Sequence, residues 1–222
     1  MTTSVVFAPH PDDETLGCGG TLLREISKGV EVHWVVMTAM NERSGYAAEQ
    51  IARRQLEIER VAAAYPFASM HQAPFPASHL DVTPLAEIVD YVSRIVKMLV
   101  PDTLFLPFRG DVHSDHAVVF DAVAACTKVF RYPSVKNVFA YEVLSETEFG
   151  LRSDTSGFCP NRFVDVSGQL DRKKEILQMY PEEIGGFPFP RSIEAIEALA
   201  RFRGVVAGVT AAEAFMVLKE IV

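Results

Sequence analysis

The sequence HPDDE at residues 10–14 combines one imidazole with three consecutive carboxylates, directly after a short apolar run. Unpaired charge near a protein core is costly, so a cluster of this kind indicates a bound partner. His10 and Asp13 are three residues apart, and His113 and His116 repeat that spacing far along the chain. Two imidazoles and one carboxylate around an open coordination position are what a catalytic zinc ion needs. We therefore predict that His10, Asp13 and His116 bind a metal ion.

Asp12 and His113 remain beside these predicted ligands, and both suit the hydrolysis of an amide. Zinc lowers the pKa of water to about 7, and the Asp12 carboxylate can then take a proton from that water. An imidazolium at His113 would stabilise the oxyanion that forms when water attacks a carbonyl, and Asp115 would keep that ring charged and oriented. Glu14 is expected to support the start of the following helix.

The elements that must position these residues alternate between strands and helices. Apolar and β-branched runs predict strands at 4–8, 30–38, 103–107 and 137–144. Helical periodicity follows the first strand and returns at 47–64, 83–100, 115–130, 170–180 and 192–202. This alternation predicts an α/β fold with a doubly wound, mostly parallel sheet in three layers, in a single domain over 1–222. The residues after about 184 are expected to form a less regular C-terminal extension.

Both polar clusters follow predicted strands. HPDDE comes after the first strand, and RGDVHSDH (109–116) comes directly after 103–107. In an open parallel sheet, ligands bind outside the carboxyl ends of the strands, so both clusters should share one edge of the sheet. The loops 39–50 and 74–82 and the tail after 184 would build the substrate pocket beside them.

The glycine-rich stretch GCGG (17–20) allows a second interpretation. A dinucleotide-binding GxGxxG motif would need a glycine at position 22, where this chain has Leu22. We therefore expect the glycines to permit close helix packing near the site. Cys18 has no dedicated base in the sequence and is expected to be a small packed side chain.

Composition narrows the class of partner. The 222 residues carry 21 Lys and Arg against 29 Asp and Glu, a net charge of −8, which disfavours nucleic acid and anionic membrane surfaces. No apolar run approaches the length of a membrane span, and the N-terminus lacks the basic start of a signal peptide. The three cysteines, Cys18, Cys126 and Cys159, are widely spaced and form no CxxC pair. We expect a cytoplasmic protein with a small-molecule partner.

HPDDE after an N-terminal strand, with HSDH further along, resembles the PIG-L/LmbE family of zinc-dependent N-deacetylases. The resemblance implies a Rossmann-like α/β fold and the removal of acetyl groups from N-acetyl sugars. It also implies metal ligands at the His and second Asp of the first motif and the last His of the second, which are His10, Asp13 and His116. The general base of the family corresponds to Asp12, and the histidine that assists at the oxyanion corresponds to His113.

Weaker similarity extends to about residue 183. Arg53, in the helix after the second predicted strand, resembles an arginine of the family that contacts substrate. Arg109 and Asp111, just before HSDH, are further candidates for substrate contacts. Tyr141 and Glu142 end a predicted strand and are candidates for the pocket wall.

Together these inferences predict a hydrolase that uses one Zn²⁺ per chain to deacetylate an N-acetylated amino sugar or its conjugate. Fe²⁺ or another divalent ion is the alternative metal, and a homo-oligomer is compatible with the resemblance. Two other functions stay open, namely a zinc amidohydrolase acting on another small N-acyl amine and a ligand-binding module with a degenerate site. Against the second, the sequence retains every residue required for metal-assisted hydrolysis.

Overall fold

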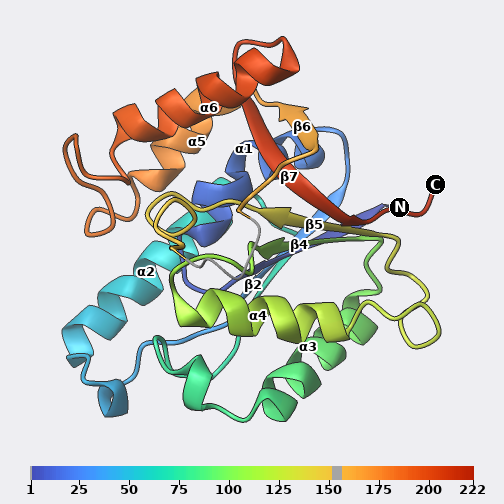
Figure 1. Cartoon of the computed structure of the whole chain (residues 1–222). Helices are drawn as coiled ribbons and strands as arrows, with labels where there is room; N and C mark the ends of the chain where they lie inside the picture. The colour runs from blue at the N-terminus through green and yellow to red at the C-terminus, as the bar shows by residue number, and fades with distance from the viewer. Residues whose placement is uncertain (1, 152–156) are drawn as a thin grey trace.

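The chain folds around a seven-stranded sheet with helices on both faces (Figure 1). The computed structural model describes residues 2–151 and 157–222. The strands are β1 (Thr3–Ala8), β2 (Glu31–Val36), β3 (Ser69–Gln72), β4 (Thr103–Pro107), β5 (Asn137–Tyr141), β6 (Arg162–Asp165) and β7 (Ala212–Lys219). Their order is β3-β2-β1-β4-β5-β7-β6, and β7 runs antiparallel to both β5 and β6. The predicted doubly wound, mostly parallel α/β sheet is confirmed.

The helices form two layers, one on each face of the sheet (Figure 1). They are α1 (Asp13–Ser27), α2 (Ala48–Ala64), α3 (Leu85–Leu99), α4 (Ser114–Ala125), α5 (Leu170–Leu177) and α6 (Ile193–Ala207), with short 3₁₀ turns at Glu42–Ser44 and Leu80–Val82. Apolar residues of α1, α2, α5 and α6 share one core with the sheet, whereas those of α3 and α4 share the other. Among the described residues, no helix combines the length and apolar character needed to cross a bilayer.

Three strands were not predicted from the sequence. β3 (SMHQ) and β6 (RFVD) are short, half-buried strands at the two edges of the sheet, so they lack the apolar run that marks an interior strand. β7 lies between β5 and β6, and with α6 it occupies the region expected to be a less regular extension. The tail is thus part of the sheet and of one helical layer.

α1 bends close to the site, at Cys18, whose φ of −142° and ψ of 16° are not helical. The bend frees the N–H groups of Gly20 and Thr21, which donate to the Glu213 carboxylate of β7 over 2.8 and 2.7 Å. Lys173 of α5 pairs with the same carboxylate at 2.7 Å, and both side chains are buried. This pair, with its contacts to α1, connects α1, α5 and β7.

The glycines of α1 allow neighbouring elements to approach the helix closely. A Cβ at Gly17 would overlap the ring of Tyr141, and a Cβ at Gly20 would lie 2.8 Å from the side chain of Val166. The expected role of these glycines in close helix packing is confirmed, and Cys18 is fully buried among them.

Candidate active site

A pocket of about 270 Å³ lies beside the carboxyl ends of β1, β2 and β4. His10 comes after β1, and His113 follows β4 as the N-cap residue of α4, so the two sequence clusters meet at one edge of the sheet. Met40, Ser78 and Arg191 also line the pocket. They come from the three segments that the sequence predicted for its wall.

His10, Asp13 and His116 converge on one point. The Asp13 Oδ2 atom lies 3.4 Å from His10 Nδ1 and 3.4 Å from His116 Nε2. It also accepts a hydrogen bond from the backbone N–H of His10 over 2.8 Å, which fixes its direction. One ligand atom from each of the three residues lies within 4.8 Å of the other two. The structure therefore brings the three predicted metal ligands together.

Two carboxylates determine which nitrogen each ring presents to Asp13. Asp111 Oδ2 lies 2.8 Å from His116 Nδ1, and Asp115 Oδ2 lies 2.9 Å from His10 Nε2. A carboxylate accepts the proton of the ring nitrogen it contacts, so His116 Nε2 and His10 Nδ1 are the nitrogens left to face Asp13 and available to bind a metal ion. His116 Nε2 is buried and has no hydrogen-bond partner among the described residues. Two imidazole nitrogens and one carboxylate oxygen facing a common point fit a divalent metal such as zinc.

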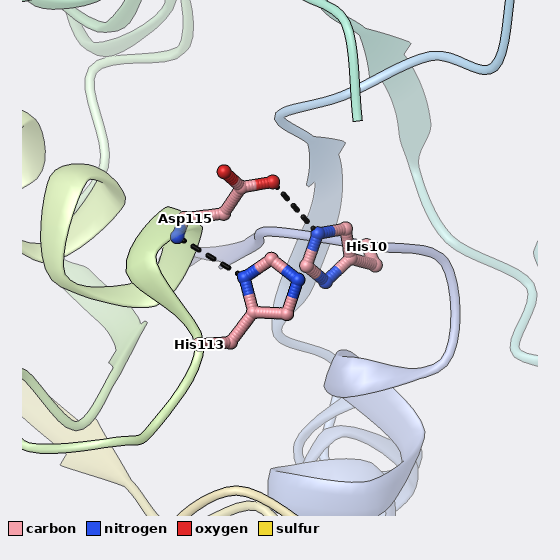
Figure 2. Close-up of side chains that lie close together, drawn as sticks. All are labelled: His10, His113 and Asp115. Atoms are coloured by element: carbon pink, nitrogen blue, oxygen red, sulfur yellow. Dashed lines mark hydrogen bonds and ion pairs between the residues drawn. The ribbon is translucent and has the colours of Figure 1, made fainter. Parts of the chain in front are cut away.

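A second metal-binding group is geometrically available at His10, His113 and Asp115 (Figure 2). Its carboxylate is already engaged, because Asp115 accepts backbone N–H groups of Ser78 and Leu80 over 2.8 and 3.0 Å besides its contact with His10. Among the described residues, Asp13 accepts one backbone N–H, that of His10, against the two that Asp115 accepts. The donor atoms thus favour the group formed by His10, Asp13 and His116.

Burial opposes charge on the histidines, but their carboxylate partners outweigh it. Hydrogen bonds to Asp115 and Asp13 raise the pKa of His10 to about 9 despite its desolvation. Burial also lowers the pKa of His116, but the charge of Asp13 and the hydrogen bond to Asp111 outweigh burial and raise this pKa well above its ordinary value. Burial also disfavours the Asp13 carboxylate, yet the two histidines lower its pKa strongly. The site therefore holds negative charge at Asp13 and attracts positive charge beside it.

His113 differs from its expected role as an imidazolium. The backbone N–H of Asp115 donates to His113 Nδ1 over 3.1 Å, so that nitrogen is an acceptor (Figure 2). Burial and the neighbouring His10 both lower the pKa of His113. The ring is therefore held neutral with its proton on Nε2. The Asp115 carboxylate, which was expected to orient His113, makes its side-chain contact with His10 instead.

Asp12 lies in the pocket wall on a strained backbone. Its φ of 124° is unusual for a residue other than glycine, and its N–H donates to Glu14 Oε2 over 3.1 Å. Glu14 in turn accepts hydrogen bonds from the hydroxyls of Thr15 and Tyr180. Glu14 therefore supports the start of α1, as expected, through a buried hydrogen-bond network.

Desolvation, the adjacent Asp13 and Glu183 raise the pKa of Asp12, while Arg191 lowers it. A backbone outlier of this kind is typical of functional sites.

The four residues predicted to contact substrate do not line this pocket. Arg53 is half exposed and pairs with Glu182 at 2.6 Å, whereas its neighbour Arg54 lines the pocket. Each helical residue turns by about 100°, so the two arginines point in different directions. The other three have partners outside the pocket. Arg109 forms an ion pair with Asp121 on the surface, and Glu142 forms one with Arg203. The Tyr141 hydroxyl donates a hydrogen bond to Phe7 O.

One residue of the site was predicted in another role, and three others were not predicted. Asp111 lies behind His116 rather than toward substrate, and its other oxygen accepts from Thr147 over 2.6 Å. Glu146, Glu183 and Arg191 line the pocket although none of them belongs to either motif. The only sequence signal for Asp111 was its place directly before HSDH, and the other three depend on loop conformation.

Comparisons with known proteins identify the family of the chain. Residues 5–127 match the family model PIG-L, GlcNAc-PI de-N-acetylase. A diacetylchitobiose deacetylase of Thermococcus kodakarensis is 30% identical over 194 residues, which are 79% of this chain and 69% of that protein.

Two solved structures share the fold of this chain. A conserved protein of Thermus thermophilus has a TM-score of 0.80 at 24% identity, covering 100% of this chain and 97% of that one. N,N'-diacetylchitobiose deacetylase of Pyrococcus horikoshii has a TM-score of 0.78 at 21% identity, covering 98% and 84%. The chain belongs to the PIG-L (LmbE-like) deacetylase family.

Proposed function

We propose that this protein is a metal-dependent N-deacetylase that removes an acetyl group from an N-acetylated amino sugar or its conjugate. The convergence of His10 Nδ1, Asp13 Oδ2 and His116 Nε2 beside the pocket carries this proposal. These three atoms would hold one Zn²⁺ or another divalent ion. When bound, the ion would supply Lewis acidity toward the acyl oxygen and would lower the pKa of water.

Asp12 is the residue that we assign as general base. Asp12 lines the pocket and is adjacent in the chain to Asp13, one of the three proposed ligands. Desolvation raises its pKa, which makes it a stronger base than an exposed aspartate. After it takes the proton from water, it can pass that proton to the nitrogen of the leaving amine. The acetate and the free amino sugar are then the two products.

His113 would stabilise the oxyanion as a neutral hydrogen-bond donor. Its Nδ1 accepts the backbone N–H of Asp115, so its Nε2–H is the group available to the pocket that His113 lines. A positioned donor in a partly dehydrated site contributes about 3–4 kcal/mol to transition-state stabilisation in comparable hydrolases. A neutral ring can perform this role without first taking up a proton.

An amino sugar fits the size and polarity of the pocket. A volume of about 270 Å³ suits one sugar unit with its acetamido group better than a long acyl chain. Tyr46, Arg54 and Gln72 place polar side chains in the wall, where sugar hydroxyls could bind them. The 30% identical relative is a diacetylchitobiose deacetylase, which supports the same substrate class for this chain.

Replacing Asp12 by Asn tests the proposal. We expect Asp12→Asn to retain zinc and to lose acetate release from N-acetylglucosamine and N,N'-diacetylchitobiose by about 10²–10⁴-fold, because the base is removed while the ligands remain. Acetate and zinc content should be measured on the same preparations. Asp171→Asn, at a 92% exposed carboxylate of α5, is the matched control and should change neither.

The alternatives predict different results in this experiment. Unchanged turnover in Asp12→Asn would exclude Asp12 as the base. Faster hydrolysis of longer N-acyl amines than of N-acetyl sugars would favour another amidohydrolase. If the unmodified protein, reconstituted with zinc or iron, neither bound metal nor released acetate, the degenerate binding module would be favoured.

A further inference from the structure

The segment between α5 and α6 brings an arginine to the carboxylate of Asp12. Arg191 Nη1 lies 3.5 Å from Asp12 Oδ2, and Arg191 Nη2 lies 3.2 Å from Glu183 Oε2. Glu183 also contacts Arg54 of α2. All four side chains line the pocket. A chain of alternating charges therefore runs from α2 across the pocket wall to Asp12.

The direction of Arg191 is set by the fold around it. The next residue, Ser192, is fully buried and is the N-cap of α6, where its hydroxyl accepts the N–H of Ala195 over 3.1 Å. The Ser192 N–H donates to Phe189 O over 2.9 Å, and the Arg191 guanidinium carbon lies 5.6 Å from the centre of the Phe189 ring. The backbone of Arg191 is thus fixed by a helix cap, and its guanidinium is fixed by a ring and by Glu183.

Asp12 needs such a contact because its carboxylate has few others. Its backbone N–H is held by Glu14, but among the described residues its carboxylate oxygens accept no hydrogen bond. Asp12 is only 3% exposed, so bulk water has little access to its side chain. At 3.5 Å, Arg191 and Asp12 form an ion pair without a hydrogen bond. The lone pairs of the Asp12 carboxylate therefore stay available to accept a proton.

We infer that Arg191 is a positioning residue for Asp12, held in place by Glu183. The inference rests on the proposed function, since it concerns the orientation of the assigned base. A base must lie within hydrogen-bond reach of the proton it takes, and a misplacement of about 1 Å can cost roughly 100-fold in rate. Arg191 contacts Asp12 and Glu183 rather than the three predicted metal ligands, so its effect should appear in turnover and not in metal affinity.

Replacing Arg191 by Met, which keeps much of the length of the side chain without its charge, tests this inference. We expect kcat for acetate release to fall by about 100-fold, with KM within about threefold of the unmodified protein and with zinc affinity unchanged. In Arg191→Ala, millimolar guanidinium should restore part of the lost kcat, whereas an effect on folding would not be rescued. Arg201→Met is the control, because Arg201 forms an exposed ion pair with Glu197 on α6.

Three results would overturn the inference. The first is a kcat within about twofold of the unmodified protein in Arg191→Met, and the second is an equal loss in Arg201→Met. The third is a loss confined to KM, which would make Arg191 a substrate contact. A crystal structure of Arg191→Met gives a readout that does not depend on turnover, and we expect a different orientation of the Asp12 carboxylate there. If the unmodified protein released no acetate, the proposed function would fail, yet an unmoved Asp12 in that crystal would still refute the positioning role.

Discussion

Each histidine that faces Asp13 has a carboxylate behind its other ring nitrogen. Asp111 holds His116 and Asp115 holds His10, at 2.8 and 2.9 Å. Such pairs fix the tautomer and the orientation of the ring and raise its basicity as a ligand. The motifs allowed the ligands to be predicted, but not which carboxylate lies behind which ring. That assignment depends on how the first turn of α4 meets the loop after β1, which a linear spacing does not determine.

The carboxylate of Asp111 should strengthen metal binding by orienting His116. Asp111→Asn replaces the acceptor of the His116 Nδ1 proton by an amide, so the ring is less firmly oriented. We expect zinc affinity to fall by about 10–100-fold, as measured by competition with a chromophoric chelator. An affinity equal to that of Asp171→Asn would show that Asp111 does not orient the ligand. The Thr147 hydroxyl, which donates to Asp111, could keep its contact with the amide oxygen.

At the scale of elements, α1 carries the site because it begins soon after His10 and bends at Cys18. Its first turn holds Asp13 and Glu14, and its glycines let β5 and the segment after β6 pack against it. The strand ends that deliver both motifs could be predicted, because apolar runs followed by polar clusters mark them. The inward position of Arg54 could not be predicted, because a shift of one residue along α2 decides whether an arginine faces the pocket or the solvent.

Gly17 tests the packing of α1. A Cβ at this position would overlap the buried ring of Tyr141, whose hydroxyl donates to Phe7 O at the end of β1. We expect Gly17→Ala to lower the free energy of unfolding by about 1–3 kcal/mol, as measured by urea denaturation. Gly168→Ala is the matched control, because a Cβ there would meet nothing within 4 Å. Equal stability of the two variants would mean that the helix can move away from Tyr141 without cost.

At the scale of the whole molecule, the site is assembled from segments far apart in the sequence. β1 and β4 are adjacent parallel strands, so their carboxyl ends place His10 beside His113 and His116. This convergence could be predicted from topology, because ligands of doubly wound sheets bind where such strands end. The sequence also predicted that the tail after 184 would help to form the pocket, but not that the tail is regular, because β7 joins the sheet out of sequential order between β5 and β6. The contact of Arg191 with Asp12 could not be predicted either.

If His10, Asp13 and His116 hold one metal ion, as we propose, anomalous diffraction should detect that ion between them. Crystals grown with zinc should be measured on both sides of the zinc absorption edge. We expect a single strong anomalous peak in the pocket, bonded to His10 Nδ1, Asp13 Oδ2 and His116 Nε2 at about 2.0–2.2 Å. A peak coordinated by His113 and Asp115 instead, or no peak beside these residues, would show that His10, Asp13 and His116 do not form the metal site.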